Sequence, residues 1–381
     1  MKLLVLNHEY PPIGGGGGQA CKDIIEELAS RGYEITLVTA HFKDLPRESR
    51  EGTARILRVP SLRKQAFRVG FMGMGVYILN SIFTGLKVIR RWKPDLIHVH
   101  FAVPAGVSAY VLHLLTGIPY ILTAHLGDVP GGVPEKTGRW FKWVFPFTIP
   151  VWKHAARIAA VSEFTASLAR KHYHVEPEII PNGMKIEPQE SPVSVNHPPR
   201  IAFAGRFMPQ KNLFTFIDIL DSVRDLNWNC SMLGDGPLYQ PVKARITELG
   251  LADRFSLPGW VNTDEVISCF KQSDILLMPS LSEGLSVVGV QALTAGLAIV
   301  ANNVGGFTDL VEAGQNGVLA EAGDVQALKD AIRMYLSTPD LLLKARHASL
   351  VAARKFDIRN IADRYEAICS EVIKNKNIPI P

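Results

Sequence analysis

The 381-residue sequence has few cysteines, no metal-binding motif and no nucleotide-binding P-loop. Its four cysteines, at positions 21, 230, 269 and 369, include no Cys-x-x-Cys pair and have no histidine at ligand spacing. This excludes a disulfide framework and a zinc site of the usual spacing, and it favours a reducing compartment. The sequence also lacks Gly-Lys-Ser/Thr and Asp-x-Asp, so neither a Walker-type loop nor an acidic metal–phosphate motif is indicated.

Neither a secretory leader nor a membrane-spanning segment is expected. The apolar run within the first twelve residues is too short for a signal peptide, and no small-residue cleavage pattern follows it. Two longer uncharged stretches, residues 69–86 and 101–127, are interrupted by glycines, prolines, histidines or polar residues. We expect both to be buried parts of a soluble α/β domain in a cytoplasmic protein.

The composition is that of a packed protein, with 47% hydrophobic and 20% charged residues, and the length favours two domains. The net charge of +5 is unevenly distributed. Residues 1–190 contain 23 Lys and Arg against 16 Asp and Glu, whereas residues 191–381 contain 18 against 20. Nine basic and no acidic residues lie between positions 52 and 94. A basic surface on the first domain is predicted, and no feature indicates nucleic acid as a partner.

Apolar runs alternate with helical patterns along the chain, which indicates parallel sheets covered on both faces. The predicted strands are residues 2–6, 35–39, 55–59, 95–99, 119–123 and 157–161, then 200–204, 229–233, 254–259, 274–278 and 298–302. Four prolines between positions 186 and 199 suggest a linker. We therefore expect an N-terminal domain (1–187), a linker (188–199), a C-terminal domain (200–355) and a last helix (356–381) that crosses back to the N-terminal domain.

Five consecutive glycines, residues 14–18, stand between the first predicted strand and a helix predicted from residue 20. Glycine lets backbone amides approach an anion, and a helix N-terminus adds partial positive charge, so Gly15, Gly16 and Gly17 are candidates to contact a phosphate. A flexible loop without a ligand explains the pattern nearly as well. The second strand ends at His41 rather than at an acid, which excludes a dinucleotide fingerprint.

His125 follows the strand 119–123, at the end where open α/β sheets bind ligands, and Asp128 comes three residues later. Such a histidine can donate to a hydroxyl or a carbonyl. A solvated loop histidine that caps a helix with Asp128 is equally compatible with the pattern. His98 and His100 alternate on one strand, and without a third ligand we interpret them as core or supporting groups rather than metal ligands.

In the second half, Gly205, Arg206 and Lys211 follow the first strand. The arginine can hold a phosphate by a bidentate fork and the lysine as a point charge, although two basic residues on a loop are commonplace. In the segment that joins a later strand to a helix, Ser286 is a predicted N-cap and Glu283 stands just before it. A carboxylate there is also an ordinary capping partner, but its place between apolar runs favours a polar contact.

The order of these motifs resembles that of retaining glycosyltransferases of family 4, which have the GT-B fold. The motifs are the glycine-rich loop, the His125 segment, GRFMPQKN (205–212), GDGP (234–237), PGWV (258–261), SEGLSVVGVQ (282–291) and NVGGFTDLV (303–311). Each is weak alone, but together they span essentially the whole chain. The resemblance implies an α/β protein of two facing Rossmann-like domains with a donor and acceptor cleft between them.

The resemblance also implies a role for each matching residue. Arg206 and Lys211 would neutralise the donor diphosphate, Glu283 would hold sugar hydroxyls, and His125 would contact the sugar near its reacting carbon. The family's second acid, which usually binds the ribose, is replaced by Gln291, whose amide binds a hydroxyl more weakly. The residues that the resemblance assigns to donor binding are Gly15, Gly16, Gly17, Gly205, Gly234, Gly259, Trp260, Val261, Gly284, Leu285, Ser286, Val287, Val288 and Gln291.

The implied reaction is sugar transfer with retention at the anomeric carbon, in which basic side chains and helix-end amides stabilise the diphosphate without a metal or other cofactor. A UDP-sugar is the favoured donor and a GDP-sugar the next. The acceptor is a hydroxyl group, for which lipid-linked and cell-envelope glycans are the implied classes. Two alternatives stay open: a non-hydrolysing nucleotide-sugar epimerase of the same fold, and a nucleotide-sugar-binding protein without transferase activity.

Residues 52–94, which include no acidic residue, have two interpretations of similar weight. The resemblance implies an acceptor or membrane surface formed by Arg63, Lys64 and Arg68 among aromatic side chains, with Asp128 also on the acceptor side. Such a protein would be peripheral on the inner face of an anionic membrane. A solvated helix face beside core aromatics explains the same residues.

Overall fold

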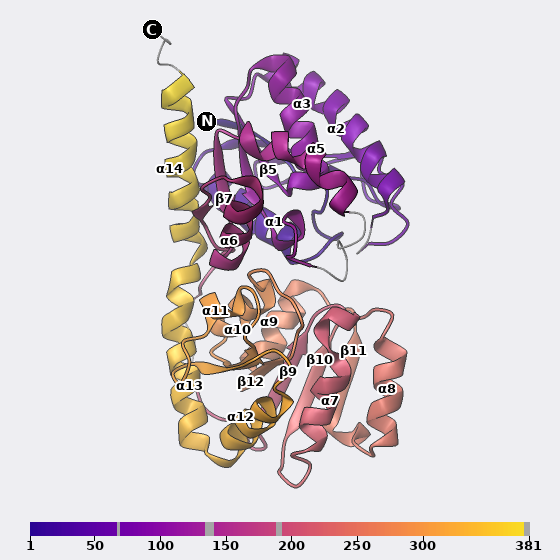
Figure 1. The fold of residues 1–381 in the computed structure, drawn as a ribbon, viewed down its shortest axis with the longest axis vertical. Coiled ribbons are helices and arrows are strands. Elements are labelled where there is room, and N and C mark those ends of the chain that lie inside the picture. The colour runs from indigo at the N-terminus through magenta and orange to yellow at the C-terminus, as the bar shows by residue number, and fades with distance from the viewer. Residues whose placement is uncertain (67–68, 134–140, 188–192, 377–381) are drawn as a thin grey trace. The chain divides into compact units, whose positions relative to one another are not determined.

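The computed structural model describes residues 1–66, 69–133, 141–187 and 193–376, and its chain divides into two compact units. Unit 1 consists of residues 1–185 and the C-terminal segment that begins at Asp357, and unit 2 is Ile186–Phe356. Each unit has its own sheet with helices around it (Figure 1). The predicted α/β class with two predominantly parallel sheets is confirmed.

The sheet of unit 1 has eight strands among the described residues, in the order β3-β4-β2-β1-β5-β6-β7-β8. All neighbours pair in parallel except β3 with β4. The strands are β1 (Lys2–Leu6), β2 (Glu34–Ala40), β3 (Glu48–Glu51), β4 (Ala54–Val59), β5 (Leu96–His100), β6 (Tyr120–Ala124), β7 (Arg157–Ala160) and β8 (Glu178–Ile179). The strand order reverses at β1 and β5, the place where open α/β sheets bind ligands.

Helices cover both faces of this sheet. They are α1 (Gly16–Ser30), α2 (Phe71–Trp92), α3 (Val107–Thr116), α5 (Phe141–Lys153), α6 (Glu163–Tyr173) and α14 (Ile358–Lys376), with short helices η1 (Ala102–Gly106) and η2 (Leu126–Asp128). Successive strand residues point to opposite faces. Leu3 and Val5 of β1 therefore pack with α1 and α14, whereas Leu4 and Leu6 join the cluster beneath the other helices.

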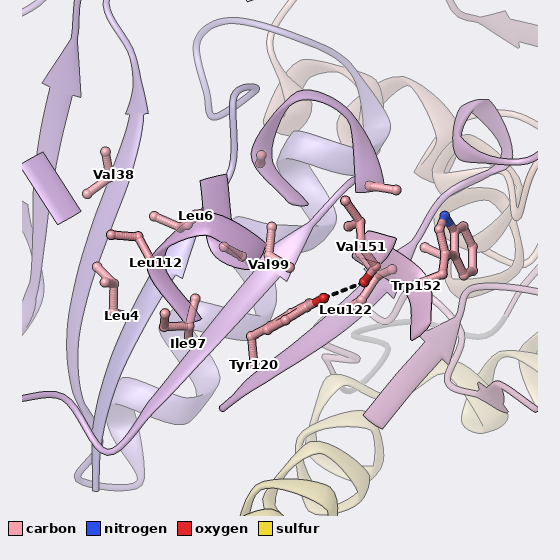
Figure 2. Packing of buried hydrophobic residues seen from close by; sticks show 14 of the residues in the cluster. Leu4, Leu6, Val38, Ile97, Val99, Leu112, Tyr120, Leu122, Val151 and Trp152 are labelled. Carbon is pink, nitrogen blue, oxygen red and sulfur yellow. Dashed lines mark hydrogen bonds between the residues drawn. The ribbon is translucent and has the colours of Figure 1, made fainter. Parts of the chain in front are cut away.

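Figure 2 shows part of that second cluster, in which strand residues such as Leu122 lie near the helix residues Val151 and Trp152. The Tyr120 hydroxyl, buried in the same cluster, donates to the Val151 carbonyl and so satisfies its polar end. The other face is completed by α14, through residues that include Ile361 and Tyr365. The last helix of the chain is thus part of the core of unit 1.

The sheet of unit 2 has six parallel strands among the described residues, in the order β11-β10-β9-β12-β13-β14. They are β9 (Arg200–Ala204), β10 (Asn229–Leu233), β11 (Phe255–Gly259), β12 (Ile275–Met278), β13 (Ala298–Asn302) and β14 (Gly317–Ala320). The helices are α7 (Leu213–Asp221), α8 (Tyr239–Glu248), α9 (Thr263–Lys271), α10 (Val287–Thr294), α11 (Phe307–Leu310), α12 (Val325–Ser337) and α13 (Pro339–Ala353), with the short helices η3 (Pro209–Lys211), η4 (Ala252–Arg254) and η5 (Arg354–Phe356).

A buried carboxylate ties the described end of the predicted linker to unit 2. Asp274, just before β12, is completely buried and accepts hydrogen bonds from the backbone N–H groups of Asn196 (3.1 Å) and Arg200 (2.7 Å). The guanidinium of Arg346, on α13, pairs with the same carboxylate. Several donors compensate the burial of this charge, so the chain before β9 is held against the base of the sheet.

Several elements were absent from the sequence-based prediction. They are β3, β8, β14, α6, α9, α11, α12 and α13. The sequence of β3, Glu-Ser-Arg-Glu, has no apolar alternation, but an edge strand tolerates polar side chains because its outer side faces solvent. Helix α1 begins at Gly16, four residues earlier than predicted, because its packing overrides the low helix propensity of glycine.

The prediction that residues 69–86 are buried is correct for only one face of α2. Gly73, Tyr77 and Ser81 are buried on this helix, but Met72 and Phe83 are 78% and 65% exposed. Among the described residues, α2 is the one helix with the length and hydropathy of a membrane span. An apolar face of this helix remains on the surface of unit 1.

Candidate active site

The carboxyl ends of three neighbouring strands in unit 2 meet at three of the predicted glycines. The Gly205 N–H donates to the Leu233 carbonyl (2.9 Å), and the Gly234 N–H donates to the Gly259 carbonyl (2.8 Å). At Gly234, where φ is +134°, a β-carbon would lie 1.9 Å from the Gly205 oxygen. Only glycine fits there, because the backbone after β10 packs directly against the backbone after β9.

Two loops join beside these glycines, one after β9 and one after β12. The Lys211 ammonium forms an ion pair with the Glu283 carboxylate, and the two side chains are 15% and 9% exposed. The Gln210 amide donates to the Ser282 carbonyl (2.7 Å) and fastens the same loops together. The structure thus brings together two predicted residues that are 72 positions apart, and Lys211 is the polar partner that the position of Glu283 suggested.

Helix α10 begins at this junction. Ser286 caps it, as predicted, because its hydroxyl accepts a hydrogen bond from the Gly289 N–H (3.2 Å). The amides of Val287 and Val288 lie in the first turn, whose N–H groups have no acceptor within a helix. Gln291, one turn along α10, is only 6% exposed. A buried amide side chain therefore stands at the position for which the resemblance implies a carboxylate.

The other predicted donor residues of unit 2 lie on the connecting loops. Arg206, in the loop that contains Lys211, is half-buried. Gly284 is half-buried and Leu285 is buried in the loop before α10. Trp260 follows β11 and is 55% exposed, and Val261 beside it is half-buried. An exposed indole next to a strand end offers a flat apolar surface to a ligand.

In unit 1, the predicted residues His125 and Gly17 are brought into contact. A β-carbon on Gly17 would lie 3.2 Å from both Nδ1 and Cε1 of the His125 ring. It would also lie 2.5 Å from the Phe101 ring, which stacks on His125 with a centroid distance of 4.2 Å. The first turn of α1, which contains Gly16 and follows Gly15, therefore lies against the Nδ1 and Cε1 atoms of the imidazole.

The structure corrects the prediction that Asp128 lies on an acceptor surface. Asp128 is 3% exposed, and its carboxylate accepts hydrogen bonds from the backbone N–H groups of His125 (2.8 Å) and Ala102 (2.9 Å). Burial raises its pKa to about 7, and these hydrogen bonds oppose that rise. Asp128 therefore holds the backbone after β5 and β6 in place and positions His125.

Arg63 was also predicted to be exposed on a basic surface, and this is wrong. It is 8% exposed, and its guanidinium donates to the carbonyls of Ala66 (2.8 Å) and His8 (3.2 Å). The two carbonyl acceptors and the nearby Glu9 carboxylate compensate the cost of burying this charge. Lys64 is exposed, as expected, and Arg68 lies outside the described residues.

Four buried histidines surround this part of unit 1, namely His8, His98, His100 and His125. Burial lowers the pKa of His8 and His98 to about 4 and that of His125 to about 3, and it holds the pKa of His100 well below its usual value. All four rings are therefore neutral at pH 7. Among the described residues, no group of three His, Cys, Asp or Glu side chains is arranged to hold a metal ion.

Sequence reasoning overlooked His8 and Phe101 in this site. His8 comes just after β1, and the place of that strand at the centre of the sheet is the signal that could have pointed to it. Phe101 has a positive φ of 72°, an unfavourable backbone conformation that no local sequence pattern reports.

Acid is expected to destabilise unit 1 through these histidines. An unfolded imidazole binds a proton below pH 6.5, whereas His8 and His98 bind one in the folded state only near pH 4. Stability is therefore lost progressively as the pH falls from 6.5 to 4, by about 3 kcal/mol for each of these two residues. Asp128 and Asp23, whose pKa values burial raises to about 7, act in the opposite direction, but they are two groups against four.

Thermal unfolding between pH 8 and pH 4 tests this expectation. The midpoint temperature of unfolding should decrease as the pH is lowered from 6.5. In His98→Leu this decrease should be smaller, because the variant lacks one of the buried imidazoles. A midpoint that stays constant from pH 6.5 to pH 4.5 would contradict the assignment of neutral, buried rings.

Two family models match the chain in succession. The model described as Glycosyltransferase Family 4 matches residues 14–187, and the model described as Glycosyl transferases group 1 matches residues 185–355. The 2-deoxystreptamine glucosyltransferase of Streptomyces kanamyceticus is 29% identical over 86% of this chain and 90% of its own.

Solved structures agree with the family models on the fold. Sucrose-phosphate synthase from Thermosynechococcus elongatus superposes with a TM-score of 0.86 at 16% identity, over 98% of this chain and 99% of its own. HepE from Anabaena, solved in complex with UDP and glucose, superposes with a TM-score of 0.75 at 18% identity, over 97% of this chain and 100% of its own. From the matched family models, the relative that spans most of the sequence and the shared fold, it follows that the chain belongs to the family 4 glycosyltransferases of the GT-B fold.

Proposed function

We propose that this glycosyltransferase moves a sugar from a UDP-sugar to a hydroxyl acceptor, with retention at the anomeric carbon and without a metal ion. The observation that carries the proposal is the Lys211–Glu283 pair, set beside Gly205 and the N-terminus of α10. An ammonium, a carboxylate and helix-end amides at one place match the two parts of a nucleotide sugar. The cation and the amides suit the diphosphate, and the carboxylate suits the sugar hydroxyls.

The diphosphate is assigned to Arg206, Lys211 and the first amides of α10. When the bond from the anomeric carbon to the phosphate oxygen breaks, both electrons go to that oxygen, and negative charge grows on the leaving UDP. Two cations and oriented N–H groups stabilise that charge without reorganising. The acceptor hydroxyl attacks from the same face, and its proton passes to the leaving phosphate.

In unit 2, Glu283 is assigned to the sugar and the strand ends to the nucleoside. In unit 1, His125 is assigned to a substrate oxygen. Glu283 is already desolvated and oriented by Lys211, so it can accept from hydroxyl groups at little further cost. Gln291 is assigned to the ribose, and Gly259, Trp260 and Val261 to the base. The fold shared with HepE, which was solved with UDP and glucose, supports UDP as the nucleotide.

A thermal-shift panel of UDP, GDP and ADP, followed by transfer assays with their sugars, tests this proposal. We expect UDP to raise the melting temperature most, because a ligand that binds the native state stabilises it by mass action. Transfer should persist in EDTA, and the product should keep the donor's anomeric configuration by NMR. Loss of activity in EDTA would refute metal independence, and an inverted product would refute retention. Binding without turnover of any nucleotide sugar would favour the alternative of a binding protein.

We further propose that the acceptor is lipid-linked and that unit 1 docks on the inner, anionic face of a membrane. Large apolar side chains are exposed on α2, α3 and α5, which pack side by side in unit 1. They are Phe71, Met72, Leu79, Phe83, Leu114, Leu115, Trp143 and Phe147. Exposed cations accompany them at Lys64, Lys87, Arg90, Arg91 and Lys93. Partial insertion and charge attraction together give stable peripheral binding.

Co-sedimentation with vesicles tests this docking. Vesicles that contain phosphatidylglycerol should bind the protein, and Phe83→Glu should reduce binding at least about tenfold, because it places a charge on the inserted face. Phe214→Glu is the matched control, since Phe214 is an exposed aromatic on α7 of unit 2. Binding that does not depend on anionic lipid, or that Phe83→Glu leaves unchanged, would contradict the hypothesis.

A further inference from the structure

One ring nitrogen of His125 is in contact with a second buried histidine. His125 Nε2 lies 3.3 Å from Nδ1 of His100, which ends β5 and is completely buried. Because burial keeps both rings neutral, each carries one N–H and one bare nitrogen. The contact is a hydrogen bond only if one of the two facing nitrogens has the proton and the other does not.

The surroundings of the other ring nitrogen of His100, Nε2, indicate which of the two facing nitrogens is protonated. Within the described residues, His100 Nε2 is buried and has no hydrogen-bond partner. Buried N–H groups without an acceptor are rarer and costlier than acceptors without a donor. The proton of His100 is therefore on Nδ1, from which it is donated to Nε2 of His125. The proton of His125 is then on its own Nδ1, and the nearby Asp128 N–H donates to the His125 carbonyl (2.9 Å) rather than to the ring.

The Nδ1 edge of His125 is the one that faces the glycine-rich turn. The β-carbon position of Gly17 lies 3.2 Å from both Nδ1 and Cε1, and stacking on Phe101 holds the ring in this orientation. His125 thus presents an N–H, rather than a lone pair, beside the first turn of α1.

We propose that His100 is a positioning residue that fixes His125 in the Nδ1–H tautomer, so that His125 donates a hydrogen bond to a substrate oxygen. The inference rests on the proposed contact between His125 and the substrate. A neutral donor aligned before the substrate arrives stabilises an oxygen that gains electron density without transferring a proton.

A neighbouring histidine provides a matched control. His98 is buried two residues earlier on the same strand, but its Nε2 lies 2.8 Å from the Thr123 hydroxyl. That hydroxyl in turn lies 3.0 Å from the hydroxyl of Tyr365 on α14. His98→Leu therefore removes an imidazole of equal burial without removing the partner of His125.

Long-range ¹H–¹⁵N NMR of the full-length protein labelled with ¹⁵N-histidine tests the tautomer directly. The signals are assigned with His100→Asn and His125→Asn. We expect His125 to be protonated on Nδ1 in the wild type and in His98→Leu. In His100→Leu the tautomer should become mixed, and kcat should fall about tenfold with a smaller change in the donor KM. His100→Asn, whose amide can donate from the place of Nδ1, should keep the Nδ1–H tautomer and most of kcat.

A wild-type His125 protonated on Nε2 would overturn the inference, even if His100→Leu fails to fold. An unchanged tautomer and kcat in a folded His100→Leu would overturn it as well. The NMR result needs no sugar substrate. An Nδ1–H tautomer in a protein that transfers no sugar would therefore refute the proposed function and leave the tautomer assignment intact.

Discussion

Replacing Glu283 by alanine is expected to reduce the kcat of glycosyl transfer by roughly a hundredfold to a thousandfold. Glu283 is buried, is oriented by Lys211, and lies next to the capped start of α10. Its removal takes away the proposed acceptor for the sugar hydroxyls and leaves Lys211 without the partner that fixes its position. The measurement is kcat and KM with the donor identified by the thermal-shift panel.

Glu283→Gln is the matched variant because it keeps the size and shape of the side chain, removes the charge, and replaces one of the two acceptor oxygens by an amide donor. An intermediate loss is expected. Both variants should stay folded by circular dichroism, because the Lys211 side chain is 15% exposed and can turn towards solvent. Near-normal kcat in folded Glu283→Ala would show that the carboxylate has no part in transfer.

Arg206→Ala should lower kcat/KM by a similar factor, roughly a hundredfold to a thousandfold, and should also weaken UDP binding. The physical reason is that a guanidinium holds a phosphate with two parallel hydrogen bonds, whereas alanine leaves the growing negative charge to Lys211 and the amides alone. Arg206→Lys should recover only part of the activity, since an ammonium is a point charge without the planar fork.

Arg200→Ala is the control for Arg206. Arg200 is an exposed arginine at the opposite end of β9, away from the loop that carries Lys211. Its loss should leave both UDP binding and kcat unchanged. If UDP raises the melting temperature of Arg206→Ala as much as that of the wild type, the assignment of Arg206 to the phosphate is wrong.

The fold was largely predictable from the sequence, because its signals are local. Apolar runs such as β1 and β12 alternate with helical patterns, and each run is long enough to identify a buried strand of a parallel sheet. The Ser286 cap was predictable for the same reason, since the hydroxyl of a serine just before a helix can accept a hydrogen bond from an unpaired backbone N–H of the first turn. The short polar strand β3 was not, because only its pairing with β4 makes it a strand.

The site was predictable in part. The glycines, Lys211 and Glu283 stand in motifs whose order resembles that of the family, so the resemblance is enough to single them out. Arg63 was assigned wrongly because its sequence neighbourhood is basic, yet the carbonyl oxygens that bury it come from Ala66 and His8. Asp128 was assigned wrongly because its three-residue spacing from His125 does not reveal that it also binds the backbone of Ala102.

The sequence by itself determined the family and the two-sheet α/β architecture, and it singled out the charged residues that we propose to bind a nucleotide sugar, because these depend on periodicity and on short ordered motifs. Only the tertiary structure decided which of those charges are paired, which basic residues are buried, and which nitrogen of His125 is engaged. Such properties depend on strands and loops that are distant in the chain and adjacent in the sheet. Glu283 and its partner Lys211 are 72 residues apart in the sequence, and His100 and His125 are 25 apart.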